Sequence, residues 1–350
     1  MGPSDESADG HEPAPATPRR RGGLGRLLGW SALLLLAALT IVAGTALYVQ
    51  AALDRPGPLG EDRAVVIPRG ASVVTIADLL ADEGVIADPL LFRLGGRLLA
   101  RERPLRAGEF AFAASISTLD AIRHLQDGAT VVRRLTVPEG LTTPEVLALV
   151  AAAPGLDGEV PTVPGEGLLL PETYHYAWGD DRAEIVTRMR DAMVAALAEL
   201  WPGRAPDLPF ATPDAALTLA SIVERETAVA AERPRIAAVF VNRLERGMRL
   251  QSDPTVAFAL SDGAPLDRPL TRADLKVEHP YNTYVVKGLP PGPIANPGRA
   301  SLAAVLNPAD SDELYFVADG SGGHAFARTL EEHNRNVAKW RKVQRERNGG

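Results

Sequence analysis

The sequence predicts an α+β fold in which one N-terminal transmembrane helix precedes a small α+β domain and a larger mixed α+β domain. An apolar run without charge, from Leu27 to Tyr48, is long enough to cross a bilayer. Two strand–turn–helix patterns follow it, at Ile67-Pro68-Arg69-Gly70 and at Val137-Pro138-Glu139-Gly140. Beyond a Pro- and Gly-rich connection at 153–167, capped helical segments are interspersed with short strands.

Length and composition exclude several classes of protein. The chain has 350 residues, enough for two modest domains, and its 23% charged and 46% hydrophobic residues are typical of a folded protein. The net charge of −7 argues against a nucleic-acid partner. The absence of cysteine excludes disulfides, thiolate catalysis and Cys-ligated zinc. The six histidines show no metal-ligand spacing, so we expect neither a metal nor a cofactor.

The apolar run indicates a membrane anchor and its orientation. At about 1.5 Å per residue it covers a hydrocarbon core of about 30 Å. A cleaved signal peptide is the alternative, but the run is longer than a usual signal core and 26 residues precede it. Basic residues are concentrated before the run, at Arg19, Arg20, Arg21 and Arg26. This bias predicts a cytoplasmic N-terminus and an extracytoplasmic remainder.

These features divide the chain into five regions. We expect a cytoplasmic disordered tail at 1–26, a transmembrane helix at 27–50, a stalk at 51–63, a small α+β domain at 64–152 and a larger domain at 153–346. The small domain should hold a strand at 64–67, helices from Val73, Pro89, Thr118 and Thr143, and a strand pair at 106–113 and 130–137. The larger domain should hold helices at 181–200, 213–230, 234–246 and 330–345, with mostly loops and short strands at 248–318.

Glu226 is the candidate for chemistry that the residues themselves indicate. A helix from Pro213 to Ala230 would place it on one face with apolar residues, namely Leu219, Ile222, Val223, Val229 and Ala230. Glu224 would point almost the opposite way. Apolar surroundings raise the pKa of a carboxyl group, which is the condition that a general acid needs at neutral pH. The alternative is a glutamate that is merely buried and paired with a cation.

Tyrosine clusters and Gly/Pro-rich loops accompany this acid. Tyrosines gather at 173–178, 281–284 and 314–316, and an aromatic ring with one polar edge suits the flat face of a sugar. Loops at 251–256 and 288–298 present backbone donors and acceptors that suit an extended polar ligand. The alternatives are core aromatic residues and ordinary turns, and spacing alone leaves both open.

Several of these segments, in fixed order, resemble one family. LASIVERETA at 219–228, NRLERGMRLQSDPTV at 242–256, YNTY at 281–284, GLPPGPIANPG at 288–298, LYFVADGSGGHAF at 314–326 and HN at 333–334 are similar to the YceG-like endolytic murein transglycosylases. The resemblance covers essentially everything after residue 27. It implies the same layout: an anchor, a LysM-like small domain and a long catalytic domain.

The resemblance also implies an activity and its residues. The enzyme would be a lyase that cuts peptidoglycan glycan strands internally, between N-acetylmuramic acid and N-acetylglucosamine, leaving 1,6-anhydro ends without a cofactor. Its catalytic glutamate would be Glu226. Candidates for substrate positioning are Glu172, Gln251, Asp253, Tyr281, Asn282 and Tyr284, with His324 and Asn334 as weaker ones. The alternative for each of these candidates is that it braces a loop.

The resemblance extends to location and partners. It implies a single-pass protein of the inner (plasma) membrane, with its catalytic domain periplasmic or extracytoplasmic, which terminates nascent strands beside peptidoglycan synthases. The small domain resembles LysM around Pro68-Arg69-Gly70 and Ile76-Ala77, and would bind glycan or brace the catalytic domain. Two alternatives remain. One is a hydrolytic muramidase, which needs a second carboxylate such as Glu172 or Asp253. The other is a non-catalytic peptidoglycan-binding scaffold.

Overall fold

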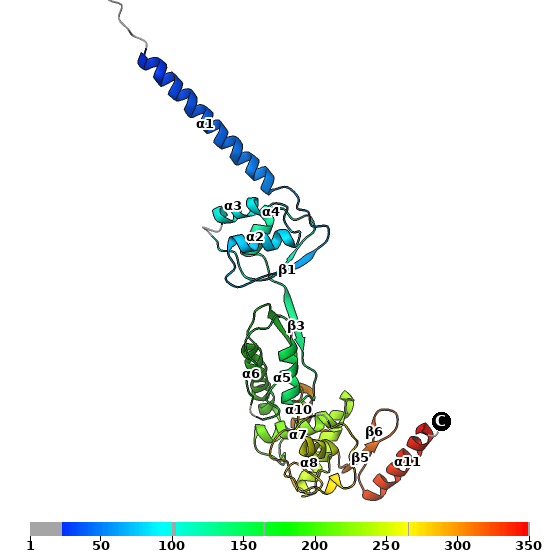
Figure 1. The fold of residues 1–350 in the computed structure, drawn as a ribbon. Coiled ribbons are helices and arrows are strands. Elements are labelled where there is room, and N and C mark those ends of the chain that lie inside the picture. Colours follow the sequence, from blue (N-terminus) through cyan, green and yellow to red (C-terminus); the bar gives the residue numbers. More distant parts are fainter. Residues whose placement is uncertain (1–22, 100–102, 164, 265, 349–350) are drawn as a thin grey trace, which may run out of the picture. The chain divides into compact units, whose positions relative to one another are not determined.

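The chain forms two compact units. The computed structural model describes residues 23–99, 103–163, 165–264 and 266–348, so most of the expected tail at 1–26 lies outside the described residues. The smaller unit comprises the described residues up to Arg63, together with 71–105 and 112–128. The larger unit comprises residues 64–70, 106–111 and 129–350, within the same described ranges (Figure 1).

The smaller unit is helical. Its helices are α1 (Gly23–Leu53), α2 (Val73–Asp82), α3 (Pro89–Leu99) and α4 (Thr118–Asp127). Helices α2 and α4 begin where expected, because the hydroxyls of Ser72 and Ser117 accept hydrogen bonds from backbone N–H groups of the first turn. Helix α3 packs against α1, α2 and α4. Its buried Phe92 belongs to the apolar interior of this unit.

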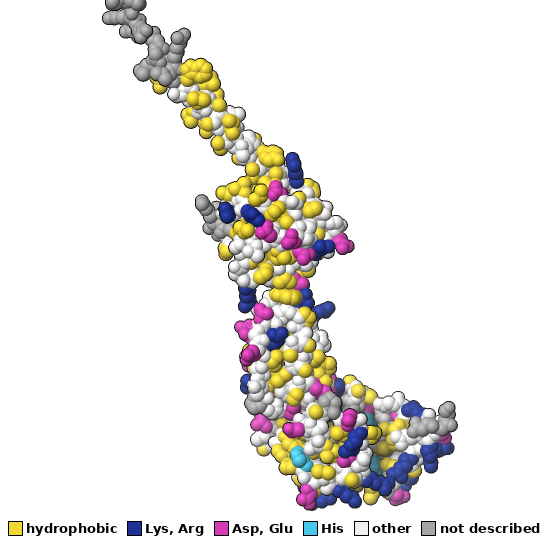
Figure 2. All heavy atoms as spheres, in the orientation of Figure 1, with side chains coloured by type: hydrophobic (Ala, Val, Ile, Leu, Met, Phe, Trp, Pro, Cys, Tyr) yellow, Lys and Arg dark blue, Asp and Glu magenta, His cyan; other side chains and the backbone are white. Residues whose placement is uncertain are grey.

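Helix α1 is apolar over almost its whole length. From Leu28 to Leu47 its large hydrophobic side chains are between 58% and 69% exposed, and Figure 2 shows them covering the helix. Among the described residues, Leu28–Leu53 is the one helix long and apolar enough to cross a membrane. Its last residues, Ala52 and Leu53, are buried in the smaller unit.

The strand pairing differs from the expectation. Strand β1 (Arg63–Ile67) pairs with β2 (Gly108–Phe112), and β3 (Val132–Thr136) pairs antiparallel with β4 (Thr173–Ala177). The predicted pairing of 106–113 with 130–137 is therefore wrong. The β3–β4 register places the buried Leu135 opposite the buried Tyr174, so a shared apolar core favours this pairing over the neighbour in sequence.

One core of the larger unit lies beneath the β3–β4 pair. Helices α5 (Thr143–Ala152) and α6 (Arg182–Leu200) pack together beside it (Figure 1). Tyr174 and Tyr176 belong to this core, and their hydroxyls donate to the backbone carbonyls of Leu170 and Pro154. The tyrosines at 173–178 are therefore core residues rather than a ligand-facing cluster.

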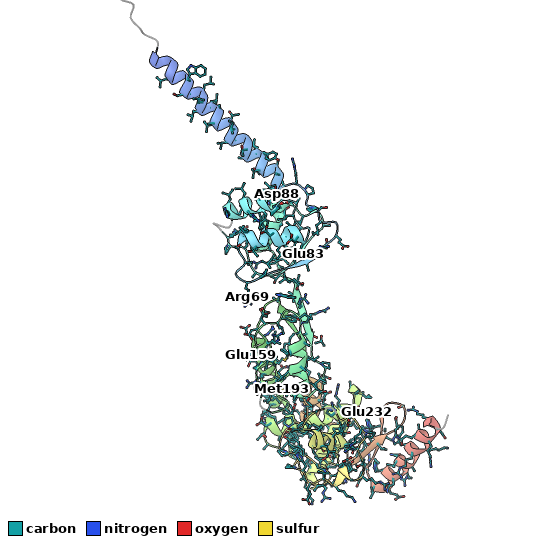
Figure 3. All side chains as sticks on the ribbon, viewed as in Figure 1. Arg69, Glu83, Asp88, Glu159, Met193 and Glu232 are labelled. Atoms are coloured by element: carbon teal, nitrogen blue, oxygen red, sulfur yellow. The ribbon has the colours of Figure 1, made fainter. Side chains whose placement is uncertain are left out.

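A second core holds the helices that carry the candidate acid. Helix α7 (Pro213–Glu226) packs against α8 (Arg233–Glu245) and α10 (Arg299–Leu306), and Met193 of α6, labelled in Figure 3, joins the same core. Every residue of α7 from Ala216 to Glu224 is buried. The remaining elements are α9 (Asp253–Ser261), β5 (Tyr315–Ala318), β6 (His324–Ala327) and α11 (Leu330–Asn348), together with three short 3₁₀ turns at Trp201–Gly203, Ala230–Glu232 and Asp274–Lys276.

The predictions for this region are confirmed in part. The segment 248–318 is mostly loops, as expected, but it also contains two short helices, α9 and α10, and its described strand is β5. Helix α9 begins with Asp253-Pro254, a pair that resembles a turn although proline is well tolerated in a first helical turn. Helix α7 also ends at Glu226 and not at Ala230, because Thr227 takes an extended conformation with φ −145° and ψ 133°.

Candidate functional site

Glu226 is the last residue of α7. The hydroxyl of Thr227 accepts a hydrogen bond from Val229 N at 3.0 Å, which stabilises the turn away from the helix. Val229 is 36% exposed, so it does not form the apolar helix face expected around Glu226. Leu219, Ile222 and Val223 are buried as expected. A negative charge at the C-terminal end of a helix is unfavourable, which favours the protonated carboxyl.

The side chain of Glu226 lines a pocket in the larger unit. The pocket has a volume of about 440 Å³. Its walls come from α7, α8, the start of α9, the 281–284 loop, β5 and α11. The lining residues are Glu226, Arg243, Gln251, Asp253, Tyr284, Tyr315, Phe316, Val317, Leu330 and His333. The acid therefore has one face against protein and another on a space that a ligand could enter.

The pKa of Glu226 is raised to about 7, chiefly by burial. The nearby charge of Asp253 acts in the same direction. A hydrogen bond from Ser252 and the electrostatic effects of His324 and Arg243 act in the opposite direction, in that order of size. Desolvation outweighs these three influences, so an appreciable fraction of Glu226 is protonated at neutral pH.

Ser252 fixes the orientation of this carboxyl group. Its Oγ donates to Glu226 Oε1 at 2.5 Å, and its backbone N–H donates to the hydroxyl of Thr283 at 3.0 Å. The hydroxyl of Thr255 lies 2.8 Å from that of Thr283 and donates to the carbonyl of Ser252 at 2.7 Å. Ser252, Thr255 and Thr283 are at most 1% exposed, so the serine sits in a closed, satisfied network.

Glu224 is also buried, and its carboxyl group has partners other than those of Glu226. It pairs with Arg233, Oε1 to Nη2 at 3.1 Å, and accepts a hydrogen bond from Gly298 N at 2.9 Å. The two acids of the motif thus differ in their partners: Glu224 has a cation and a backbone donor, while Glu226 has a neutral hydroxyl.

A buried arginine forms another wall of the pocket. Arg243 donates from Nε to the carbonyl of Leu314 at 2.6 Å and from Nη1 to that of Leu250 at 2.5 Å. Its guanidinium lies 5.3 Å from the ring centre of Tyr315, and burial lowers its pKa from the ordinary value. The ring of Tyr315 in turn stacks on His333, with centres 5.2 Å apart.

Three of the predicted positioning residues lie in this pocket. They are Gln251, Asp253 and Tyr284. Tyr284 donates from its hydroxyl to Asp253 Oδ1 at 2.7 Å, and burial followed by this bond raises the pKa of the phenol. Gln251 has a φ of +52°, which is uncommon for a residue other than glycine, and its N–H donates to Thr283 O at 3.1 Å.

The other predicted residues lie outside the pocket lining. Tyr281 contacts Phe258, their ring centres 4.8 Å apart, beside a different cavity. Asn282 is fully buried; its amide donates to Leu275 O and Val277 O, and its Oδ1 accepts from Tyr284 N. It braces the loop that supports Ser252.

Three further candidates are also outside this lining. Glu172 is exposed just before β4, where its carbonyl accepts a hydrogen bond from Val137 N. His324 Nδ1 lies 2.7 Å from Glu232 Oε2; Glu232 is labelled in Figure 3. Asn334 is exposed on α11.

Four residues of the site were not among the predicted ones, although all lie within the segments that resemble the family: Ser252, Arg243, Tyr315 and His333. Their role follows from proximity across the chain: 26 residues separate Ser252 from Glu226. His333 Nδ1 is buried, makes no hydrogen bond to the described residues and belongs to a side chain that lines the pocket. No spacing rule connects such distant positions, so their meeting could not be predicted from periodicity.

Known proteins share this architecture. The model of the YceG-like family matches residues 65–339. A protein of Bacillus subtilis named endolytic murein transglycosylase is 32% identical over 335 residues, covering 86% of this chain and 91% of that protein. A Streptococcus pneumoniae protein of the same name is 30% identical over 322 residues, covering 79% of this chain and 58% of that protein.

A solved structure agrees with these matches. The crystal structure of a YceG-like protein from Listeria monocytogenes, at 2.6 Å, superposes with a TM-score of 0.53 and 33% sequence identity. The match covers 79% of this chain and 98% of the Listeria chain. The family match spans well over half of the residues and includes every pocket-lining side chain described above. This chain belongs to the YceG-like family.

Proposed function

We propose that this protein is an endolytic lytic transglycosylase that cleaves the bond between N-acetylmuramic acid and N-acetylglucosamine inside peptidoglycan strands. The observation that carries the proposal is the state of Glu226: a carboxyl group with a pKa of about 7, held by Ser252 on the wall of a pocket. The relatives named endolytic murein transglycosylase support the choice of substrate.

Glu226 acts first as the acid. Ser252 donates to Oε1, which suits the carbonyl-like oxygen of a protonated carboxyl group and leaves Oε2 to carry the proton. Glu226 transfers this proton to the glycosidic oxygen while the bond from that oxygen to C1 of the muramic acid breaks. The leaving sugar departs with a free hydroxyl, and positive charge develops at C1.

Glu226 then acts as the base. The 6-hydroxyl of the same muramic acid attacks C1, and its proton passes to the ionised carboxylate. A 1,6-anhydro ring forms, no water is consumed, and the acid returns to its starting state. The tyrosine rings of Tyr284 and Tyr315 supply flat apolar faces with polar edges on the pocket wall, where sugar rings would stack.

Digestion of purified peptidoglycan tests this proposal. We expect the full chain in detergent to release fragments with anhydro ends, and Glu226→Gln to lower the rate at least a thousandfold. Products are identified by mass, because an anhydro end weighs one water less than a reducing end. Equal activity of Glu226→Gln would contradict the assignment, and an inactive wild type would favour a non-catalytic scaffold.

Hydrolysis is the second candidate, and one observation keeps it open. Asp253 lines the same pocket as Glu226, so a second carboxylate is present there. A hydrolase would use it to activate water and would give reducing ends. The same mass measurement separates the two reactions. Glu172, the other carboxylate considered for this role, is not among the pocket-lining residues.

We further propose that α1 anchors the protein in the plasma membrane, with the N-terminus cytoplasmic and the chain after it extracytoplasmic. The length and apolar surface of Leu28–Leu53 support the anchor, and the arginines before it support the orientation. Residues 64–152 would form a LysM-like domain that contacts glycan, and 153–346 the catalytic domain. Beside peptidoglycan synthases, such an enzyme would terminate nascent strands.

A further inference from the structure

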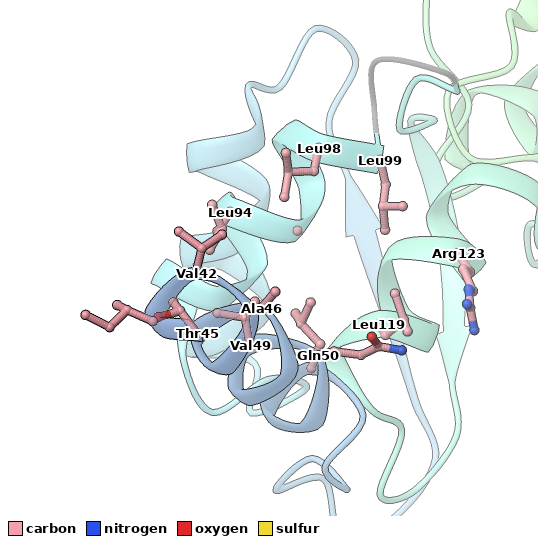
Figure 4. A pocket seen from close by; sticks show the side chains of 13 residues that line it. Val42, Thr45, Ala46, Val49, Gln50, Leu94, Leu98, Leu99, Leu119 and Arg123 are labelled. Atoms are coloured by element: carbon pink, nitrogen blue, oxygen red, sulfur yellow. The ribbon is translucent and has the colours of Figure 1, made fainter. Parts of the chain in front are cut away.

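An apolar groove lies between α1 and the helices beside it in the smaller unit. Its volume is about 610 Å³. Figure 4 shows Val42 and Val49 of α1 on one side and Leu94, Leu98 and Leu119 of α3 and α4 on the other. Three of its thirteen lining side chains are polar: Thr45, Gln50 and Arg123. A groove with so few polar groups fits a hydrocarbon ligand.

Helix α3 continues this apolar surface outward. Leu90, Leu94 and Leu98 are 68%, 45% and 60% exposed, and a spacing of four residues puts them on one face. The opposite face holds the buried Phe92 and Gly96. The interior face of α3 is therefore already packed. The row formed by Leu90, Leu94 and Leu98 remains exposed among the described residues.

The position of the groove along α1 identifies what covers it. About 20 helical residues cross a hydrocarbon core of about 30 Å. A span that begins at Leu28, just after Arg26, reaches the outer edge of the core near Leu47. The α1 wall of the groove runs from Ile41 to Leu53, across that edge. The leucines of α3 that line this groove therefore lie near that edge, where outer-leaflet acyl chains meet the headgroups.

The α1–α3 contact is close because a glycine permits it. A side-chain carbon added at Gly95 would lie 3.3 Å from a methyl group of Leu53 and 3.0 Å from one of Ile122. Both of these side chains are buried. The end of α1 is thus packed into the helices of the smaller unit, and α3 is carried at a fixed place beside the span.

Basic side chains border the leucine row where lipid phosphates would lie. Arg97 is exposed, adjacent to Leu98 on α3. Arg93, on the same edge, pairs with Asp78. Arg123 stands at the groove and reaches Asp120 at 3.4 Å from an exposed position. Arginines can place their stems on apolar surface and their charge at the headgroup level.

We propose that α3 is seated in the outer leaflet of the membrane, with phospholipid acyl chains filling the α1–α3 groove and contacting Leu90, Leu94 and Leu98. The inference rests on the anchoring role proposed for α1 and is independent of the chemistry at Glu226. It makes the smaller unit a membrane-surface element with a fixed orientation, rather than a domain carried on a free stalk.

Depth-dependent fluorescence quenching tests the proposal. The chain has no native cysteine, so a single cysteine at Leu94 or Leu98 can carry a polarity-sensitive dye. The full chain is placed in vesicles of phosphatidylcholine and phosphatidylglycerol whose acyl chains are brominated at a shallow or a deep position. We expect the dye at both sites to be quenched at least threefold, more strongly by the shallow bromines than by the deep ones.

Two further sites separate the possible results. Val42→Cys, on α1 itself, must be quenched if the helix spans the bilayer, and Val132→Cys, exposed on β3 of the larger unit, should not be. Quenching at Val42 but not at Leu94 and Leu98 would overturn the inference while leaving the anchor intact. No quenching at Val42 would overturn the anchor and this inference together.

A second copy of the chain is the competing occupant of the groove. Dilution of the labelled protein in the vesicles distinguishes it: lipid contact leaves quenching at Leu94 unchanged over a hundredfold range of protein to lipid. If another copy covers the groove, dilution should abolish energy transfer between the dyes of neighbouring copies and should increase bromine quenching at Leu94. That result would overturn the proposal. Circular dichroism of each labelled chain confirms that the fold is retained.

Discussion

Ser252 donates a hydrogen bond to Glu226, Oγ to Oε1 at 2.5 Å, and so joins the start of α9 to the end of α7. The bond lowers the pKa of Glu226 against the larger effect of burial, which raises it to about 7. It also fixes one carboxyl oxygen. The same hydroxyl group therefore orients the acid and opposes the effect of burial on its pKa.

Replacing this hydroxyl should change the pH profile in a defined direction. In Ser252→Ala the stabilising bond to the carboxylate is lost, so we expect the pKa of Glu226 to rise. Activity that needs the protonated acid would then persist to higher pH, while kcat falls about tenfold because the acid is less well oriented. The measurement is the rate of anhydro-product release between pH 5 and 9.

Ser261→Ala is the matched control for this change. Ser261 lies at the other end of α9, and its hydroxyl donates to the carbonyl of Ala257 at 2.9 Å. This variant should keep the wild-type profile. A Ser252→Ala profile that does not move, or that shifts to lower pH, would contradict the expectation that this bond lowers the pKa of Glu226.

Glu226 should also make stability depend on pH. Its folded-state pKa of about 7 is above the ordinary value of 4.5, so the folded chain binds the proton more tightly than the unfolded chain. Stability contributed by this proton is complete below about pH 4.5 and is lost as pH rises toward 7. The loss is up to about 3 kcal/mol, since one pKa unit corresponds to about 1.4 kcal/mol.

Glu226→Gln removes this titration and tests its sign. At pH 8 the variant should unfold at a higher temperature than the wild type, and at pH 4 the two should coincide. Thermal unfolding in detergent, followed by circular dichroism at both pH values, measures the difference. A variant that is less stable than the wild type at pH 8 would indicate that the ionised carboxylate of Glu226 is well stabilised in the folded chain.

The sequence allowed much of this fold to be predicted because local signals decide it. Helices α2, α4 and α5 begin at Val73, Thr118 and Thr143 as expected, each after a Ser or Thr cap. Both strand–turn–helix patterns are present, with positive φ at Gly70 and Gly140. Each feature depends on a short stretch of consecutive residues.

The site was less predictable because distant contacts form it. Burial of Glu226 was expected from its neighbours on the same helix. However, α7 ends at this residue, and the pocket around it is formed by residues from α8, α9, β5 and α11. Glu224 was expected to point almost the opposite way from Glu226, but its partners, Arg233 and Gly298, could not be predicted from the helix alone. Helical periodicity predicted that Glu226 lies against apolar residues, but it described only part of the environment of this acid.

Arg243 should be essential for the shape of the pocket. Arg243→Met leaves two buried carbonyls, of Leu250 and Leu314, without their donor, at a cost of about 1–3 kcal/mol each. We expect the unfolding temperature to fall by about 5 °C or more. Thermal unfolding followed by circular dichroism measures the fall.

Arg246→Met provides the comparison, because Arg246 is exposed three residues later and surface changes are usually within about 0.5 kcal/mol. Similar unfolding temperatures for the two variants would show that the bonds of Arg243 contribute little.

Replacing Asp253 tests the type of reaction. It should also shift the pKa of Glu226 in the direction opposite to the shift caused by replacing Ser252. The charge of Asp253 raises the pKa of Glu226, so Asp253→Asn should lower that pKa and move the fall of activity to lower pH. A lytic transglycosylase needs no second carboxylate, and anhydro products should persist in this variant at a reduced rate. A hydrolase would lose its water-activating base and with it nearly all product.

Asp262→Asn is the matched control for this variant, at the left-handed C-cap of α9 with φ 50°, a conformation that asparagine tolerates. It should leave both the profile and the products unchanged. Opposite shifts for Ser252→Ala and Asp253→Asn, with anhydro ends retained in both, would establish Glu226 as the titrating acid, since both neighbours influence the same carboxyl group. Shifts in the same direction, or reducing ends in the wild type, would refute that assignment.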